Sequence, residues 1–197
     1  MDRQPYHHGD LKQKLIDKGL LLLNKEGIEG FSLRKVASMC GVSHTAPYKH
    51  FKDKEELINV IIKEIWNKFY LALLDVVKLY PNEQELKIIE MGKAYVKFMV
   101  QHPDYLKLMF LSDSVYSIKI KDNKCYGEGG SAFEIFKNNA ESFFKEINLD
   151  ESLYIEKVLA MWSLVHGISI LLTKKSLEYD GDYMELVERI IKNGLMI

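Results

Sequence analysis

Apolar residues recur at helical spacing along nearly the whole chain. A first helix is predicted over 10–25, and apolar residues at positions i, i+3, i+4 and i+7 predict a short second helix over 33–40. Ser32 is a suitable N-cap for the second helix, and Gly41 stands where that helix must stop and turn. A third, very short helix is expected over about 43–50.

The remaining predicted helices are longer. Asp53 followed by Glu56 forms a variant of the capping box, which predicts the start of a long helix that Pro81 ends. Further helices are predicted over 83–101, from 103 onward, over 133–147, over 150–174 and from 183 onward. The chain is therefore expected to be all-α, with about nine helices.

The segment 112–130 breaks this helical pattern. Val115, Ile118 and Ile120 hint at a β-strand, but a lone strand has no partner with which to form a sheet. We therefore expect a loop in this segment.

The composition indicates a globular protein with a sizeable core, since 47% of the residues are hydrophobic and 28% are charged. No signal peptide is recognised. The most apolar window, Val158–Leu172, contains polar residues and falls short of the roughly 18–20 apolar residues that span a bilayer. Cys40 and Cys125 are far apart and are expected to be free thiols. These observations favour a cytoplasmic protein with no membrane partner.

Charge is distributed unevenly between the two parts of the chain. Residues 1–56 carry ten Lys and Arg against eight Asp and Glu, whereas residues 57–197 carry 17 against 20. This asymmetry is mild and does not by itself indicate nucleic-acid binding. We expect two domains with these bounds.

The second and third predicted helices cannot bury a core alone and must pack on the first and fourth. The third helix then presents an outward face of hydrogen-bond donors and cations, which fits the major groove of DNA: His44, Thr45, Tyr48, Lys49 and His50. Backbone N–H groups at Ser32 and at Asp53–Lys54 can bind phosphates. The alternative is a solvated polar helix between two packed ones.

The stretch Val42–Phe51 (VSHTAPYKHF), followed by Lys54–Leu57 (KEEL), closely resembles the DNA-binding signature of the TetR family of regulators. The lead-in Gly30–Ala37 (GFSLRKVA) is similar to the same family, and the resemblance covers about the first 60 residues. It implies an N-terminal three-helix domain with a helix-turn-helix and a C-terminal helical domain for ligand binding and dimerisation. It also implies a transcriptional regulator of double-stranded operator DNA, which we expect to be a repressor.

The resemblance also assigns roles to single residues. Ser32, Tyr48, His50 and Lys54 match positions that hold phosphates, and His44, Thr45 and Lys49 match positions that face bases. Pro47 stands where many relatives carry an aliphatic residue. If Ser43 caps the third helix, Pro47 removes its first intrahelical hydrogen bond, whereas it removes none if His44 is the cap.

The N-terminal segment contains the pair His7–His8 near Asp10 and Arg3. Adjacent histidines without a third ligand make a weak metal site, so no metal is expected. The segment is equally compatible with an arm that contacts DNA and with a disordered tail.

The last two predicted helices are candidates for a two-fold dimer interface. The segment Val158–Leu172 is apolar nearly all round, and the final helix carries one apolar stripe. TetR-like proteins dimerise through these helices, and the predicted interface residues are Val165, Ile168, Leu171, Leu172, Leu186, Val187, Ile190 and Ile191. Burial in the core of the subunit is the alternative explanation of the pattern.

The resemblance implies a pocket for a small, mostly apolar effector in the C-terminal body, where aromatic and Met residues are dense. The predicted lining is Trp66, Phe69, Met91, Tyr95, Phe98, Met109, Phe133, Trp162 and His166. Plain core packing is the alternative for any one of them. Trp162, His166 and Gly167 also look like the Trp–His–Gly signature of a C-terminal subgroup. For His166 itself, a core histidine with a satisfied hydrogen bond is favoured over a ligand contact.

An enzyme is not expected. The sequence contains no Gly-rich phosphate loop, nucleophile elbow or metal-spaced set of His, Asp and Glu, and His166 and Cys125 lack an orienting partner. No cofactor is predicted. A helical protein–protein adaptor that does not bind DNA is the remaining alternative function.

Overall fold

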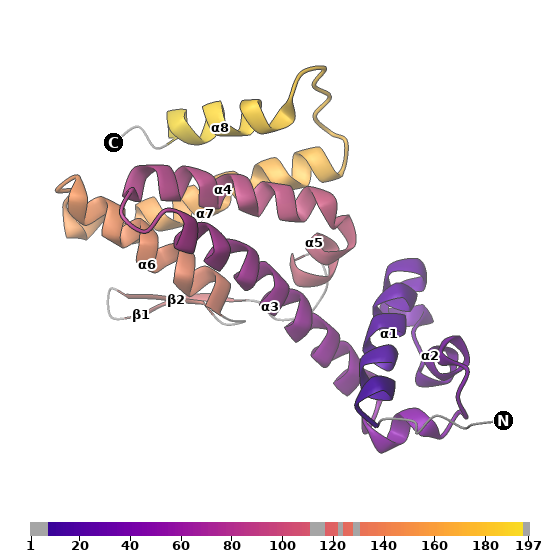
Figure 1. The fold of residues 1–197 in the computed structure, drawn as a ribbon. Helices are drawn as coiled ribbons and strands as arrows, with labels where there is room; N and C mark the ends of the chain where they lie inside the picture. Colours follow the sequence, from indigo (N-terminus) through magenta and orange to yellow (C-terminus); the bar gives the residue numbers. More distant parts are fainter. Residues whose placement is uncertain (1–7, 111–116, 122–123, 128–130, 195–197) are drawn as a thin grey trace. The chain divides into compact units, whose positions relative to one another are not determined.

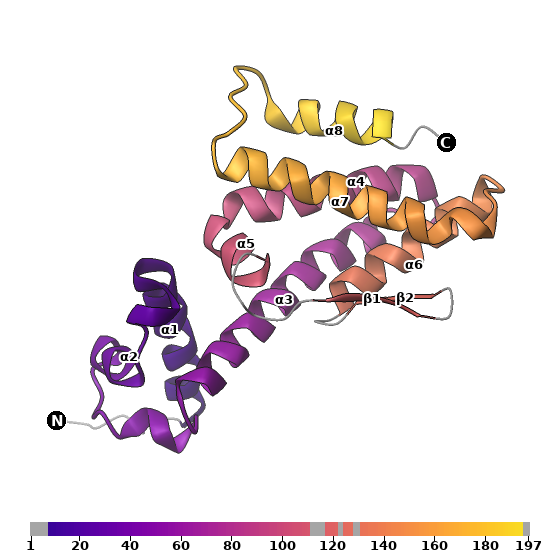
Figure 2. The same ribbon diagram turned by 180° about the vertical axis from the view of Figure 1, so that it is seen from behind.

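The computed structural model describes residues 8–110, 117–121, 124–127 and 131–194. The described part of the chain contains eight α-helices, two 3₁₀ helices and one hairpin (Figures 1 and 2). Their bounds are α1 His8–Gly30, α2 Leu33–Cys40, η1 Ala46–Lys49, α3 Lys54–Leu79, α4 Gln84–Gln101, α5 Pro103–Phe110, β1 Ile118–Lys121, β2 Lys124–Gly127, α6 Ser131–Glu146, η2 Glu151–Leu153, α7 Tyr154–Thr173 and α8 Tyr183–Gly194. The all-α prediction is confirmed. The expected count of nine falls to eight because the third predicted helix is the 3₁₀ helix η1.

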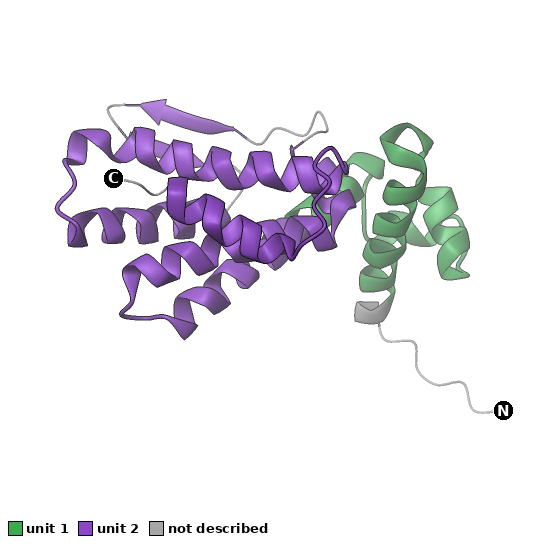
Figure 3. Ribbon diagram, turned by 90° about the horizontal axis from the view of Figure 1, so that it is seen from above, with its two compact units in different colours: residues 1–64 green, residues 65–197 purple. Residues whose placement is uncertain are grey.

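The chain forms two compact units, which divide between Glu64 and Ile65 (Figure 3). The division lies within α3, so this helix begins in the first unit and ends in the second. The expected boundary between a DNA-binding domain 1–56 and an effector domain 57–197 concerns function, and it stays a prediction.

The first unit has a small core between α1, α2 and the beginning of α3. Leu15, Val36 and Leu57 are fully buried there, one from each helix. Phe31, directly before the cap of α2, is also buried. This burial agrees with the hydrophobic staple that its place before the cap indicates. The helix α1 continues five residues beyond the predicted end, to Gly30, with a kink at Gly27.

The second unit is organised around α4, which packs against α6, α7 and α8. Gly92 permits a close approach here, because a Cβ at this position would lie 2.7 Å from Ile191 Cδ1 and 3.4 Å from Val165 Cγ1. A larger residue would require the end of the Ile191 side chain on α8 to shift.

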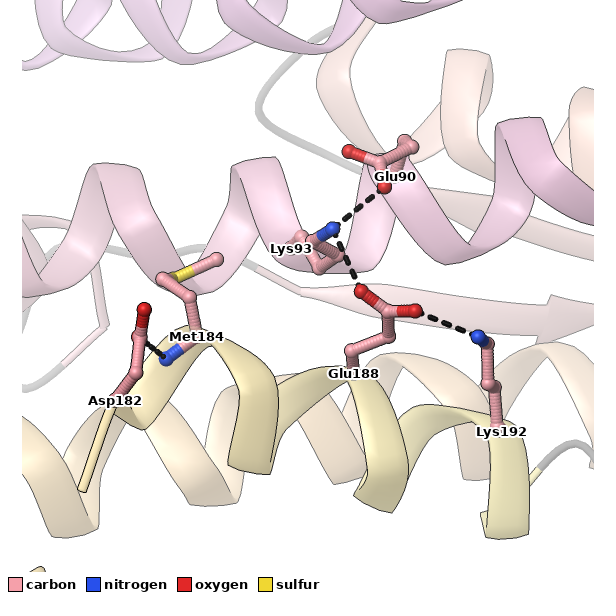
Figure 4. A network of polar contacts seen from close by, with 6 residues as sticks. All are labelled: Glu90, Lys93, Asp182, Met184, Glu188 and Lys192. Atoms are coloured by element: carbon pink, nitrogen blue, oxygen red, sulfur yellow. Dashed lines mark hydrogen bonds and ion pairs between the residues drawn. The ribbon is translucent and has the colours of Figure 1, made fainter.

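Ion pairs also hold α8 on α4 (Figure 4). Lys93 on α4 contacts Glu90 of its own helix at 2.6 Å and Glu188 on α8 at 2.9 Å. Glu188 also contacts Lys192 at 2.6 Å. The two lysines hold the pKa of Glu188 down at about 2. The carboxylate of Glu188 therefore stays charged and links the two helices over a wide pH range.

A two-stranded antiparallel hairpin, β1–β2, replaces the loop expected over 112–130. Ile120 does form a strand, and its partner is Cys125, in a segment whose residues carry no apolar alternation. The prediction of a loop was therefore wrong for 118–121 and 124–127, because it assumed that the strand had no partner. Val115 lies outside the described residues.

Candidate DNA interface and effector site

The helix α2 begins and ends as the sequence predicts. Ser32 is its N-cap, with an extended backbone and a side-chain oxygen that accepts a hydrogen bond from the Lys35 N–H at 3.3 Å. Gly41 ends the helix in the left-handed conformation, at φ 71° and ψ 30°. Its N–H donates to Ser38 O, and the Val42 N–H donates to Ala37 O, both at 3.1 Å. The chain therefore reverses sharply at a position that suits glycine.

The recognition segment that follows is a single short turn of 3₁₀ helix. Thr45 is its N-cap, in place of Ser43 or His44, and Pro47 is the second helical residue. An N–H at that position has no acceptor within the helix, so proline costs no hydrogen bond there. The Pro47 carbonyl accepts from His50 N–H and Phe51 N–H, both at 2.9 Å. Pro47 is itself buried, so the proline anchors the segment on the core.

The side chains predicted to contact DNA project from this anchored turn. His44, Thr45 and Lys49 are exposed, and 55% of Tyr48 is accessible to solvent. His50 is half-buried beside the Phe51 ring, with 6.4 Å between the ring centres. None of these five residues forms an ion pair within the described part of the chain, so their side chains can contact a polyanion. Thr45 Oγ1 also lies 3.2 Å from Ser43 Oγ.

The start of α3 differs from the expectation that its N–H groups bind phosphate. Asp53 Oδ1 accepts from the Glu56 N–H at 2.8 Å, and the Glu56 carboxylate accepts from the Lys52 N–H. The Asp53 bond confirms the predicted cap, whereas Glu56 accepts from the N–H before the cap rather than from that of Asp53. The arrangement also places two carboxylates where a phosphate would bind. A phosphate contact by Lys54 would therefore have to come from its ammonium group, which lies 3.9 Å from Glu55 Oε1.

The N-terminal arm with Arg3 and His7 lies outside the described residues. Within the described part of the chain, no three His, Cys, Asp or Glu side chains come together as a metal site would require.

The predicted effector residues meet in one aromatic cluster inside the second unit. Phe69 of α3 lies at its centre, with its ring 5.0 Å from that of Tyr95, 5.2 Å from Phe98 and 6.2 Å from Trp162. The Trp162 ring in turn lies 5.2 Å from the Phe133 ring. We call these residues, with Trp66 and His166, the aromatic cluster. It joins α3, α4, α6 and α7.

One polar pair lies within this apolar surrounding. The Tyr95 hydroxyl and His166 Nδ1 are 2.8 Å apart. Burial lowers the pKa of His166, so the ring is neutral at neutral pH. His166 therefore has a partner within the aromatic cluster, as a core histidine would, and its contact with a ligand stays a prediction.

Four ring-bearing residues at the cluster were not among the predicted lining. Phe110 of α5 contacts Trp66 at 5.2 Å and His166 at 4.6 Å, and Phe136 contacts Trp162 at 5.3 Å. His102 and Tyr105 stack at 4.6 Å next to Phe98. Phe110 and Phe136 stand on apolar faces that the sequence identifies, but helical spacing does not show which rings meet. The predicted Met91 and Met109 are both buried.

The predicted dimer residues fall into two sets. Val165, Ile168, Val187 and Ile191 are buried within the subunit, and the packing at Gly92 involves two of them. Leu171 is 45% exposed, and Leu172, Leu186 and Ile190 are partly exposed. Only this second set is available to a partner, because the first set is buried within the subunit.

The segment Glu151–Thr173 is long and apolar enough to cross a membrane by length and composition. This segment contains α7, which packs against three helices of the second unit: α4, α6 and α8. Only 28% of its most apolar stretch is buried within the subunit, which leaves apolar surface on this helix.

Comparison with known proteins identifies the class of protein to which this helix-turn-helix and helical body belong. Residues 15–61 match the model for bacterial regulatory proteins of the tetR family, and residues 88–193 match the model for the tetracyclin repressor-like C-terminal domain. The second match covers more than half of the chain. The protein belongs to the TetR family, and it is a DNA-binding transcriptional regulator rather than an enzyme.

Individual relatives agree with this assignment. The chain is 21% identical to the HTH-type transcriptional regulator YobS of Bacillus subtilis over 95% of its own length and 94% of the relative's. It is 37% identical to the class D tetracycline repressor protein of Escherichia coli over 54 residues, which are 27% of this chain and 25% of that protein. A Rhodococcus sp. RHA1 protein of unknown function has the same fold, with a TM-score of 0.77, 24% identity and coverage of 98% and 97%.

Proposed function

We propose that this regulator is a cytoplasmic homodimeric repressor that leaves its operator when a small, mostly apolar ligand binds at the aromatic cluster. The observation that carries the proposal is the position of Phe69. This residue lies at the centre of the aromatic cluster and on α3, the helix that begins directly after the recognition segment.

The DNA-binding half of the proposal is supported by the exposed polar side chains on η1. His44, Thr45 and Lys49 can reach base edges in the major groove, and Tyr48 and His50 can hold phosphates on either side. Ser32 begins a helix whose first turn has no acidic residue, so the α2 N-terminus favours a phosphate.

The helix α3 provides the connection between ligand and DNA. Leu57 and Ile61 are buried in the first unit, whereas Trp66 and Phe69 belong to the aromatic cluster. A ligand that favours one arrangement of α3 would change the separation of two recognition segments in a dimer. Tight binding needs both half-sites at once, roughly 34–36 Å apart or a multiple of that distance. A typical coupling of about 1–3 kcal/mol would lower DNA affinity roughly 5- to 150-fold.

The mostly apolar character of the ligand follows from the walls of the aromatic cluster. Rings from four helices surround the hydrogen-bonded pair Tyr95 and His166. Such a site favours hydrocarbon or aromatic surface and offers few polar groups. Membership of the Trp–His–Gly subgroup stays a prediction.

The dimer contact is proposed for the apolar surface that α7 and α8 leave outside the subunit core. Leu171 and Leu172 on α7, and Leu186 and Ile190 on α8, would form a self-complementary patch about a two-fold axis.

Two experiments test the proposed function. Footprinting of the promoter nearest the gene should show a protected, pseudo-palindromic site whose affinity falls steeply with salt, because phosphate contacts release counterions. Compounds that raise the Tm in a thermal-shift screen should then compete with DNA. If a symmetric site is protected but no stabilising compound competes with DNA, the protein still binds an operator and the ligand mechanism is wrong. If no site is protected, both operator binding and the ligand mechanism are wrong.

A further inference from the structure

A cavity of about 540 Å³ lies between β2, the outer face of α6 and the segment where η2 leads into α7. Its size is within the usual range for small-molecule sites, roughly 300–1,000 Å³. No residue of the aromatic cluster lines it. We call it the hairpin cleft, and it is a different site from the proposed effector pocket.

The wall formed by the hairpin is fixed to α6. Glu134 Oε1 accepts from the Gly127 N–H at 3.1 Å, and Lys137 Nζ donates to the Cys125 carbonyl oxygen at 3.0 Å. Lys137 also pairs with Glu134 at 2.6 Å and lies 5.8 Å from the centre of the Tyr126 ring. The charge of Lys137 is therefore neutralised by Glu134, a residue that does not line the cleft.

The opposite wall is formed by the first residues of α7 and the 3₁₀ turn before it. Tyr154 lines the cleft, and its ring packs against Phe144 of α6 at 5.2 Å. Burial raises the pKa of Tyr154, and the carboxylates of Glu151 and Glu141 raise it further. The hydroxyl of Tyr154 thus lies in a field of negative charge.

Glu141 affects a titratable group on each wall of the hairpin cleft. Besides Tyr154, it contributes to the raised pKa of the Cys125 thiol, for which burial is the main cause. Neither Glu141 nor Glu151 has an ion-pair partner among the residues that the structure describes, and Lys145 is the one lining cation without a carboxylate partner there. Apart from the Lys137–Glu134 pair, the lining thus carries the carboxylates of Glu141 and Glu151 against the single ammonium group of Lys145, which stands one helical turn after Glu141 on α6.

We infer that the hairpin cleft binds an organic ammonium ion, that is, a protonated amine with a hydrocarbon or aromatic body. Glu141 is its central counterion, Glu151 adds negative charge, and the rings of Tyr126 and Tyr154 flank the ligand. Carboxylates supply the charge that such a cation lacks once it leaves water, and tyrosine faces attract cations in the same way.

The test uses phenethylammonium as the probe, with phenethyl alcohol as the neutral analogue and phenylacetate as the anion of similar shape. Binding to the full chain without DNA is measured by calorimetry and by NMR shifts of the hairpin and α6 amides. The amine should bind roughly ten-fold more tightly than the alcohol, because one close ion pair at a protein surface contributes on that order. The anion should bind most weakly of the three.

Two variants of opposite sign sharpen the test. Glu141→Gln should weaken binding of the amine, whereas Lys145→Met should strengthen that binding because it removes a like charge. Glu146→Gln, exposed on the same helix and outside the lining, serves as the matched control. Equal binding of amine and alcohol, or no saturable binding of the amine, would overturn the proposal. A reversal of both signs would show that the cleft prefers anions, which would also overturn it. Because DNA is absent, the outcome does not depend on operator release.

Discussion

The recognition segment and the aromatic cluster hold their candidate residues in opposite ways. On η1 the chemistry is carried by exposed side chains, and a buried proline and Phe51 hold the turn beneath them. In the aromatic cluster the candidate residues are themselves the core, with Phe69 and Tyr95 almost fully buried. Substitutions of the exposed residues of η1 should therefore change DNA binding but not the free energy of unfolding. Substitutions in the aromatic cluster should change both ligand binding and that free energy.

The largest effect is expected from Trp162→Ala, which would remove a ring packed against Phe69, Tyr95, Phe133 and Phe136. Large-to-small changes of this kind cost about 3–5 kcal/mol of the free energy of unfolding. Tyr48→Ala, by contrast, should change that free energy by less than about 0.5 kcal/mol. Urea unfolding of both variants measures the contrast. Similar losses in the two would show that η1 and the aromatic cluster do not differ as described.

The second prediction concerns the surface that α7 leaves exposed. Leu171→Glu should yield monomers, because a dimer would bury an unpaired charge at a cost of several kcal/mol. Since Leu171 is 45% exposed in the subunit, the variant should still fold. Light scattering gives the mass, and Leu79→Glu is the control, as Leu79 is 72% exposed outside the last two helices. A folded dimer of the Leu171 variant would place the interface elsewhere.

The sequence identified the α7 and α8 interface only in part, for a physical reason. The sequence of a helix that is apolar on two sides predicts that both sides are buried. It does not indicate which side faces the subunit core and which faces a partner. Val165 and Leu171 therefore looked equivalent, and the structure separates them through the packing of α4 at Gly92. The caps at Ser32, Gly41 and Asp53 were predictable because their causes are local.

The hairpin shows the other limit of sequence reasoning. Ile120 pairs with Cys125 on the second strand, which Glu134 and Lys137 attach to α6. Ile120 is 57% exposed, so its apolar character does not report burial. The same tertiary contacts create the hairpin cleft, which explains why no motif in the sequence indicates it.

The third prediction separates two roles on the recognition segment. Tyr48→Ala, at a phosphate position, should weaken binding to every DNA sequence and reduce the salt dependence. Lys49→Ala should relax the preference at particular base pairs by about 1–3 kcal/mol. Binding to a set of single-base operator variants distinguishes the two, with Lys97→Ala on α4 as the control. Uniform weakening by Lys49→Ala would contradict its assignment as a base-reading residue.

The smallest effect is expected where α8 joins α4, at Glu188. Its pKa is about 2, below the usual 4.5, mainly because of hydrogen bonds from Lys192 and Lys93. A lowered carboxyl pKa contributes stability that is complete above 4.5 and is lost as the pH falls through the folded value. Glu188→Gln should therefore lower the Tm slightly at about pH 7, and the difference from the wild type should shrink toward about pH 3. Glu185→Gln, exposed on the same helix, should show neither effect. A difference in Tm for Glu188→Gln that stays constant over this pH range would mean that lost packing, rather than the ion pairs with Lys93 and Lys192, accounts for it.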